Sequence, residues 1–388
     1  LLAPSTSGGL TLVLNDPSNP VLDSALPATT LVGANGASYS VTSGDIDNDG
    51  DIDLVVANSG INEYFINDGT STAFSTATAN AFGPLVFSFD VDLGDVDNDG
   101  DLDLVVANTS QNLLFLNNGT SSPYSTSTPI SSDSVTSGTI VLADMNRDGL
   151  LDVVVGNDST PNKIYLNDGV GDPFDTNPGI ELGRDEGEST ELVVKDINHD
   201  GFLDIVTTTD GAKPVLIYLT EDNVNYNKIT GVRPSAESFA GAGLVIEDFN
   251  NDGSQDIAVA GRGINRLYHN DSVAESFNTV VEATAGDAEV GVKLAHGDID
   301  NDGDIDVIST TVNNTKPNKM FLNNGSDFPF SDRAIDVAKE TSTSMDAALG
   351  DLNNDGLLDL VVANDGESNK IYLNNGGSTP FSNLTIGA

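Results

Sequence analysis

Seven short acidic segments dominate this sequence of 388 residues. Each follows the pattern Asp-x-(Asp/Asn)-x-Asp-Gly-x-x-Asp, and successive copies begin 49 to 53 residues apart. The oxygens at positions 1, 3, 5 and 9 and the backbone carbonyl at position 7 can converge on one hard cation, because glycine at position 6 permits a tight chain reversal. The pattern therefore predicts a cation site in every copy. The copies begin at Asp45, Asp95, Asp144, Asp196, Asp248, Asp298 and Asp351.

We expect four side-chain ligands and one carbonyl ligand in each copy. The side-chain ligands of the first three copies are Asp45, Asp47, Asp49 and Asp53; Asp95, Asp97, Asp99 and Asp103; and Asp144, Asn146, Asp148 and Asp152. Those of the other four are Asp196, Asn198, Asp200 and Asp204; Asp248, Asn250, Asp252 and Asp256; Asp298, Asp300, Asp302 and Asp306; and Asp351, Asn353, Asp355 and Asp359. The carbonyl ligands belong to Asp51, Asp101, Leu150, Phe202, Ser254, Asp304 and Leu357.

The donor chemistry favours calcium, with up to seven ions, one for each copy. The chain has no cysteine and three histidines, and oxygen-only ligands disfavour zinc and copper. Magnesium holds its water too tightly to accept this many carboxylates. One isolated Asp-rich turn is usually only a solvated turn, because Asp, Asn and Gly are ordinary turn residues, but seven copies in phase argue against that interpretation.

Four copies replace the second Asp with Asn, so we expect them to bind more weakly. Arg147 and His199 at position 4 of the third and fourth copies are further departures. The fifth copy, which carries Ser254 and Gln255 before its last Asp, is the most divergent.

The segments after each copy predict β-strands. An EF-hand would need Glu at position 12, where the first copy has Val56, and helices on both sides. Instead, short β-branched runs such as 54–57, 104–107 and 360–363 follow, and each leads to a second run that ends in an Asn-rich turn. A period of about 50 residues with several short strands is typical of a propeller. We therefore predict an all-β fold, a seven-bladed β-propeller of four-stranded antiparallel blades, with a calcium loop in each blade on the same rim.

The repeats resemble a known family. Gly44-Asp-Ile-Asp-Asn-Asp-Gly-Asp-Ile-Asp-Leu-Val-Val-Ala-Asn58 and its counterpart 94–108 resemble FG-GAP/VCBS repeats, the propeller repeats of the integrin α-subunit type. The resemblance covers about residues 35–388. It implies a calcium-binding propeller, whereas its implications for function are broad, since such propellers serve adhesion, lectin-like sugar binding and, in some polysaccharide lyases, catalysis.

The N-terminal segment does not fit the count of seven. We expect one domain over 1–388, with a linker-like segment at 1–9, an extra strand segment at 10–34 and seven repeats at 35–388. Leu12-Val13-Leu14-Asn15-Asp16 resembles the third strand of a repeat. It can pair beside the last blade and close the ring, which is the interpretation we favour, belong to an incomplete eighth blade, or add a strand to a neighbouring molecule.

Charge limits the partners. A net charge of −45 with 15 Lys and Arg leaves no basic face for nucleic acid or an anionic membrane, and no apolar run approaches the length of a membrane span, about 18 residues. Calcium modules of this kind work at the millimolar calcium found outside cells, so we expect an extracellular or cell-surface location.

Three functions remain open at this point. The first is a non-catalytic binding or adhesion module for a glycan or an extracellular protein, with Tyr39, Tyr124, Tyr226, Asn108 and Asn313 as candidate ligand contacts. The second is a calcium-stiffened subunit of a surface assembly or filament, with self-assembly through the N-terminal strand.

The third is a polysaccharide lyase, whose general base would be a tyrosine or histidine. We expect His199, His269 and His296 to be structural or incidental, so no catalytic residue is assigned and an enzyme is the least favoured interpretation. The arginines of the divergent middle repeats are the candidates for holding a uronate, namely Arg184, Arg233, Arg262 and Arg266.

Overall fold

The structure is a computed structural model, and it describes most of the chain. The described residues are 2–3, 10–12, 29–31, 37–69, 79–171, 173–174, 178–183, 188–209, 215–220, 231–232, 241–263, 265–270, 279–282, 289–326, 330, 334–338, 341–353, 355–365, 369–377, 379–381 and 386–387. Within them there is no helix that is long and apolar enough to cross a membrane.

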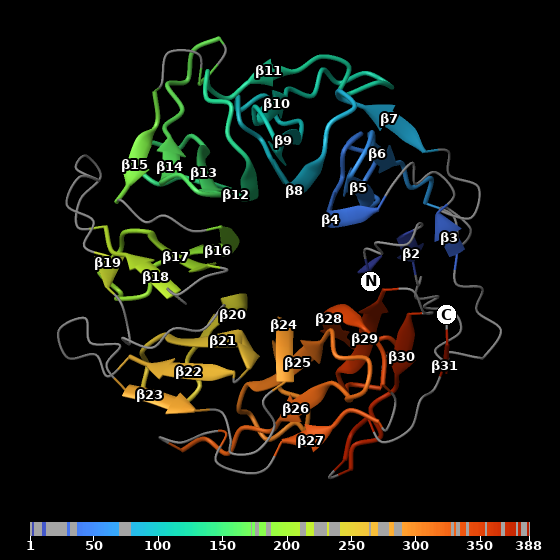
Figure 1. Ribbon diagram of the computed structural model, residues 1–388. Coiled ribbons are helices and arrows are strands. Elements are labelled where there is room, and N and C mark those ends of the chain that lie inside the picture. The colour runs from blue at the N-terminus through green and yellow to red at the C-terminus, as the bar shows by residue number, and fades with distance from the viewer. Residues whose placement is uncertain are drawn as a thin grey trace.

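Seven four-stranded antiparallel blades form a ring around a central axis (Figure 1). Blades 1 to 3 contain β4 (Ser38–Gly44), β5 (Asp53–Asn58), β6 (Asn62–Phe65) and β7 (Asn80–Phe82); β8 (Ser88–Gly94), β9 (Asp103–Asn108), β10 (Leu113–Phe115) and β11 (Thr128–Pro129); and β12 (Ser137–Ala143), β13 (Asp152–Asn157), β14 (Asn162–Tyr165) and β15 (Ile180–Leu182). Blades 4 and 5 contain β16 (Ser189–Lys195), β17 (Asp204–Thr209), β18 (Val215–Tyr218) and β19 (Gly231–Val232); and β20 (Gly241–Glu247), β21 (Asp256–Gly263), β22 (Arg266–His269) and β23 (Thr279–Glu282). Blades 6 and 7 contain β24 (Glu289–Gly297), β25 (Asp306–Thr311), β26 (Lys319–Phe321) and β27 (Ile335–Asp336); and β28 (Ser344–Gly350), β29 (Asp359–Asn364), β30 (Lys370–Tyr372) and β31 (Ile386–Gly387).

The predicted all-β seven-bladed propeller is therefore confirmed. In each blade the first strand lies nearest the axis, and the acidic segment connects it to the second strand (Figure 1). The second strand is buried along its whole length in blades 1 to 4, 6 and 7. Such a strand has neighbours on both faces, which explains the continuous apolar runs in blades 1 to 3 and 7, whereas blades 4 and 6 continue with buried Thr and Ser residues.

The hydrophobic core lies between the blades. Each of six buried clusters contains residues from two consecutive blades, from the pair of blades 1 and 2 through the pair of blades 6 and 7. Blades 5 and 6 are also joined directly, because β21 pairs with β24. In the same pair of blades, Gly243 of β20 permits a close approach to β24, since a Cβ there would lie 2.8 Å from the Cα of Lys293.

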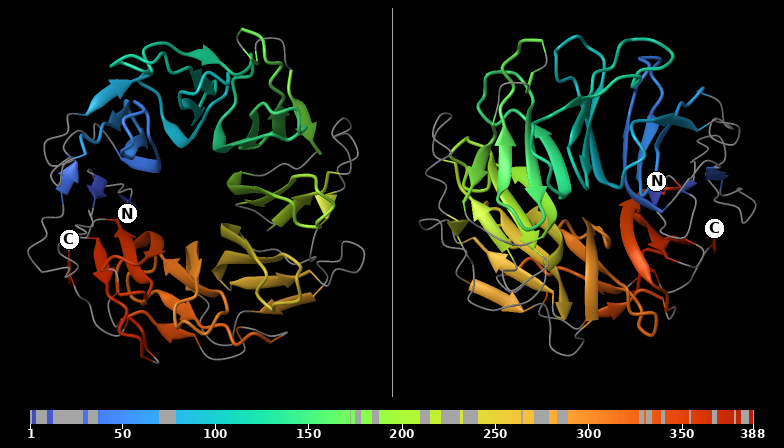
Figure 2. Two further views of the ribbon diagram at one scale, coloured as in Figure 1. Left: turned by 180° about the vertical axis from the view of Figure 1, so that it is seen from behind. Right: turned by 45° about the horizontal axis from the view of Figure 1, so that its top comes forward.

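The N-terminal strands occupy the gap between blade 1 and blade 7 (Figures 1 and 2). The strands β1 (Leu2–Ala3), β2 (Leu10–Leu12) and β3 (Thr29–Leu31) pair only with one another among the described strands. If Leu12 is matched with Tyr64, the pairs Leu2↔Leu12 and Leu12↔Thr29 correspond to Val55↔Tyr64 and Tyr64↔Asn80 in blade 1. The three strands thus have the register of the second to fourth strands of a blade.

This arrangement bears on two expectations for the N-terminal segment. Among the described strands, these three pair with one another and with no strand of blade 7, a pattern that resembles the incomplete eighth blade among the three alternatives. Closure of the ring by the N-terminal segment stays a prediction. Leu2–Ala3, expected in a linker, form a strand. Residues 13–16 lie outside the described part of the chain.

One buried asparagine in each of five blades links that blade to the preceding one. In blade 2, Asn117 donates from Nδ2 to the carbonyl of Ile46, in the acidic segment of blade 1, at 2.9 Å. The corresponding bonds run from Asn167 to Val96, Asn270 to Ile197, Asn323 to Phe249 and Asn374 to Ile299. Each of these carbonyls is buried away from water and needs a hydrogen-bond partner from the protein. The asparagine of the next blade supplies that partner.

Carboxylates near the axis link blades in the other direction. Asp90 of β8 accepts hydrogen bonds from Ser40 in blade 1 and from the backbone amide of Ile140 in blade 3. In blade 4, Glu191 accepts the backbone amide of Leu244 in blade 5 and lies 3.0 Å from the ammonium of Lys293 in blade 6. Acidic side chains thus accept hydrogen bonds from backbone amides of two innermost strands, β12 and β20.

Burial raises the pKa of the carboxyls of Asp90, Glu191 and Asp346. Lys293 acts in the opposite sense on all three. Although burial disfavours its charge, the neighbouring carboxylates, led by Glu191, raise the pKa of Lys293 above its ordinary value. The lysine therefore offsets part of the cost of keeping these acids near the axis.

We predict that Asn117→Ala destabilises the ring by about 1–3 kcal/mol, because the carbonyl of Ile46 is left buried and unpaired. Asn117→Thr should fall between Asn117→Ala and the parent protein, since Thr220, at the same position in blade 4, keeps a bond to Leu203 of its own blade. The exposed Asn118→Ala is the matched control. Denaturant midpoints check the order, and equal midpoints for Asn117→Ala and Asn118→Ala would contradict it.

We also predict that Lys293→Met lowers the melting temperature more at pH 8 than at pH 4. The folded-state pKa values of Asp90, Glu191 and Asp346 are raised, so their favourable contribution is complete below the unfolded pKa and is lost as pH rises through the folded value. Without Lys293 this loss grows. The exposed Lys316→Met should show no such pH trend, and a trend of the opposite sign for Lys293→Met would contradict the assignment.

Candidate functional site

The seven acidic segments all connect the first strand of a blade to its second strand, so they lie on one face of the ring. We number them loops 1 to 7 after their blades, and loop 1 comprises residues 45–53. Glycine at the sixth position has a φ between 85° and 97° in all seven loops. This left-handed conformation is strained for other residues, which explains the invariant glycine of the pattern.

Hydrogen bonds within each loop hold its carboxylates in place. In loop 1, Asp45 accepts the backbone amides of Asp49 at 3.0 Å and Gly50 at 2.9 Å, and Asp49 accepts that of Asp51 at 2.9 Å. The ninth residue, Asp53, is fully buried and accepts the amide of Ile46 with one oxygen and that of Asn67 with the other. The loop is therefore arranged by its own backbone before any ligand is considered.

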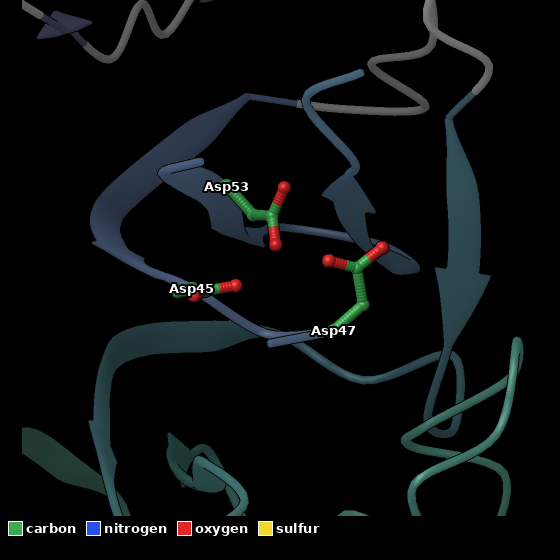
Figure 3. Close-up of side chains that lie close together, drawn as sticks. All are labelled: Asp45, Asp47 and Asp53. Carbon is green, nitrogen blue, oxygen red and sulfur yellow. The ribbon is translucent and has the colours of Figure 1, made fainter. Parts of the chain in front are cut away.

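Three loops bring at least three carboxylates together. Figure 3 shows Asp45, Asp47 and Asp53 of loop 1 directed toward a common space. In each such group, one oxygen per residue lies within 4.8 Å of the others. The groups in loops 1, 2 and 6 are Asp45, Asp47 and Asp53; Asp95, Asp97 and Asp99; and Asp298, Asp300 and Asp302. Only these three loops have Asp at position 3.

In these groups, burial and mutual repulsion disfavour the ionised form of the carboxyls. Burial, followed by repulsion from Asp49 and Asp45, raises the pKa of Asp47, and the equivalent Asp97 and Asp300 behave alike. Burial also raises the pKa of Asp53 to about 6. A cation in this space would relieve the repulsion, and oxygen donors at this spacing suit a hard divalent ion.

Loops with Asn at position 3 are organised differently. In loop 3, Asn146 donates from Nδ2 to Oδ2 of Asp148 at 2.9 Å, and the same bond forms in loops 4, 5 and 7. Asn at position 3 thus forms a hydrogen bond with the position 5 carboxylate, whereas Asp at position 3 repels it. In loop 4, Oδ1 of Asp196 is buried and has no hydrogen-bond partner among the described residues, so one oxygen of that loop remains available.

Position 4 has a role that sequence reasoning missed. The residues there have a φ between 57° and 61° in six described loops, and in five of these their side chains extend to the next loop, away from their own carboxylates. Arg147 is one of them, since its guanidinium lies 4.7 Å from the ring centre of Phe202 in loop 4. Arg147 therefore acts between loops as well as being a departure from the repeat.

The candidate ligand contacts differ in exposure to solvent. Tyr39 is 39% exposed and packs against Phe87 and Phe89 of blade 2, with ring centres 4.5 and 5.8 Å away. Tyr124 and Asn108 are corrections, because both are buried. Tyr124 donates to the carbonyl of Leu102, and Asn108 accepts the hydroxyl of Ser88.

Two candidate ligand contacts remain, Asn313 and Tyr226. Asn313 lies in the turn after β25 and accepts hydrogen bonds from Thr315. Tyr226 lies outside the described residues. The tyrosines that recur at one repeat position are buried, as their recurrence predicts, and these are Tyr64, Tyr165, Tyr218, Tyr268 and Tyr372.

The three histidines lie apart from one another in the repeats. His269 is buried with Nδ1 3.4 Å from the carboxylate of Asp256, His296 lies 3.6 Å from Glu247, and His199 is exposed in loop 4. His269 and His296 therefore each lie beside one carboxylate of a blade. Arg266 is buried in β22 and Arg262 lies in β21, whereas Arg184 and Arg233 lie outside the described residues.

Solved structures with the same fold confirm the architecture. BBS1N, crystallised in complex with ARL6DN, aligns over 93% of this chain and 94% of its own length, with 12% identity and a TM-score of 0.51. An Agrocybe aegerita lectin, whose structure concerns recognition of non-reducing terminal N-acetylglucosamine, aligns over 93% and 92% with 17% identity and a TM-score of 0.52. At these identities the similarity shows the fold alone.

Sequence comparisons give the family. Curated protein sequences give no match. The model of the FG-GAP-like repeat matches six segments in two overlapping series, 45–106, 95–155 and 144–207, and 248–309, 298–362 and 351–388, which together span most of the chain. Each match begins at the first aspartate of a loop, and five of the six extend into the second strand of the following blade, so the repeat in the sequence is offset from the structural blade. The chain therefore belongs to the FG-GAP-like repeat family.

Proposed function

We propose that this protein is an extracellular binding module whose blades are stabilised by calcium ions in the acidic loops. The observation that carries the proposal is the convergence of Asp45, Asp47 and Asp53 in loop 1, with its counterparts in loops 2 and 6. Their oxygens lie close enough together to share one ion. Membership of the FG-GAP-like repeat family supports this role.

Charge supports calcium as a structural requirement. The protein carries a net charge of −45, and seven divalent ions would offset 14 of these charges and leave −31. At a calcium concentration about 100 times the dissociation constant, each site that only the folded state binds adds about 2.7 kcal/mol. Such weak oxygen sites are filled at the calcium concentration outside cells, which supports the extracellular location.

The ligand surface that we propose lies at the other end of the inner strands. Tyr39 is near the start of β4, about 20 Å along the strand from loop 1. It forms an aromatic cluster with Phe87 and Phe89, and Leu85 beside this cluster is 76% exposed. Exposed aromatic rings stack on the C–H faces of sugars or receive apolar side chains, so this surface suits a glycan or a protein ligand.

We predict opposite effects of Asp47→Asn with and without calcium. In chelator the variant should melt at a higher temperature than the parent protein, because the repulsion around Asp47 is removed and an amide can donate to Asp49, as in loop 3. In millimolar calcium it should gain less stability than the parent, because a ligand charge is lost. Differential scanning calorimetry measures both melting temperatures.

Asp158→Asn, outside the loops, is the matched control and should show no such reversal. Isothermal titration calorimetry of the parent protein gives the stoichiometry, and magnesium should produce a smaller effect than calcium. A melting temperature that does not respond to calcium or chelator would contradict the proposed role of the loops.

For the ligand surface, we predict that Tyr39→Ala weakens binding of the sugars or extracellular proteins that a glycan and protein array identifies, by about tenfold for a central aromatic contact. Val170→Ala, which alters an exposed apolar residue elsewhere, should bind like the parent. Unchanged affinity of Tyr39→Ala for every ligand found would exclude this surface.

A further inference from the structure

Residues at position 4 connect consecutive loops around the rim. Asn48 of loop 1 donates to the carboxylate of Asp101 in loop 2 at 2.6 Å, and Asn251 of loop 5 donates to Asp304 in loop 6 at 2.6 Å. Both acceptors occupy position 7 of their loops. Position 7 therefore has two roles. Its side chain accepts a hydrogen bond from the preceding loop, and its backbone carbonyl is expected to face the cation of its own loop.

Two further links end one residue earlier. Asn98 of loop 2 donates to the carbonyl of Gly149 in loop 3 at 3.3 Å, and Asn301 of loop 6 donates to that of Gly356 in loop 7 at 3.4 Å. Between loops 3 and 4 the link is the stacking of Arg147 on Phe202, again at position 7. All five links run in the same direction, from one loop to the next.

The series is interrupted after loop 4. His199 occupies position 4 there with the same left-handed backbone and is exposed, and among the described residues it makes no contact of this kind with loop 5. Loops 1 to 4 thus form one linked group, and loops 5 to 7 form a second. Asn354, at position 4 of loop 7, lies outside the described residues.

From this geometry we infer that cation binding is cooperative within each linked group and independent between the two groups. The inference rests on the proposed function, because it concerns the same ions. A cation in loop 2 fixes Asp101 through its backbone carbonyl. The fixed carboxylate then holds Asn48, whose neighbours Asp47 and Asp49 are expected ligands of loop 1.

Coupling of this kind needs no change in fold. A loop whose neighbour is already ordered loses less conformational freedom when it binds its own ion, so the second ion binds more tightly. The same coupling acts in reverse, because the effect of loop 2 on loop 1 must equal that of loop 1 on loop 2. Each link is a single hydrogen bond or a single ring contact. We therefore expect the coupling to act between adjacent loops.

The test is a calcium titration followed by hydrogen exchange and mass spectrometry, with peptides that report each loop separately. Asp97→Asn weakens loop 2, and in the parent background it should raise the calcium concentration that half-protects loop 1 by about fivefold. In Asn48→Gly, which keeps the left-handed backbone without the side chain, Asp97→Asn should leave loop 1 unchanged. The matched control replaces His199 with glycine.

The second boundary provides an internal comparison. Asp252→Asn weakens loop 5 and should leave the midpoint of loop 4 unchanged, both in the parent protein and in His199→Gly. If loop 1 ignores Asp97→Asn in the parent, or responds equally in Asn48→Gly, the inference of coupling is overturned. If no loop gains protection at any calcium concentration, the proposed function itself fails, so the two failures are distinct.

Discussion

The buried carboxylate at the ninth position of each loop is the constraint on which the rest of the structure depends. Asp53 opens the second strand of blade 1, and its two oxygens accept the amide of Ile46 in the loop and that of Asn67 at the end of the third strand. One side chain therefore joins the loop to both buried strands of its blade. Its burial raises its pKa to about 6. The same carboxylate faces the candidate cation space (Figure 3).

Between blades, polar links act together with the hydrophobic clusters. A blade has neighbours on both faces, so its buried carbonyls and amides need partners that water cannot supply. Asn117 supplies one to the preceding blade, and Asp90 supplies one to the following blade. Because such links run in both directions, a blade supplies hydrogen-bond partners to buried backbone groups of its neighbours. This is the nearest-neighbour coupling expected of repeat proteins. Loops 1 to 7 lie at the ends of the same strands, so ions bound there, as proposed, would stabilise the same ring as the packing.

The sequence predicted the blades well because their signals are local. Position 6 glycine, the apolar run at 54–57 and the Asn-rich turn at 67–69 each follow from one stretch of chain. Contacts between repeats carry no such signal. Asn108 and Tyr124 were interpreted as surface groups because Asn and Tyr are usually exposed, yet Asn108 recurs as Asn58, Asn157 and Asn364, and that recurrence was the available sign of a structural role. The side chain at position 4 also recurs, as Asn48, Asn98, Asn251, Asn301 and Asn354. That recurrence did not identify its partner, which lies about 50 residues away in the next repeat.

The contrast between the two kinds of loop bears on whether the loops are only turns. Asn at position 3 gives the better turn, because its amide donates to the position 5 carboxylate, as Asn146 does to Asp148. Asp at that position gives a worse one, since Asp47 meets the charges of Asp49 and Asp45. A chain that needed turns alone would gain stability from Asn in all seven loops. Three loops nevertheless carry the repulsive residue, and these three are the ones whose carboxylates converge most closely. A bound cation would offset this repulsion, and the contrast therefore supports the proposal of ion binding over a purely structural turn.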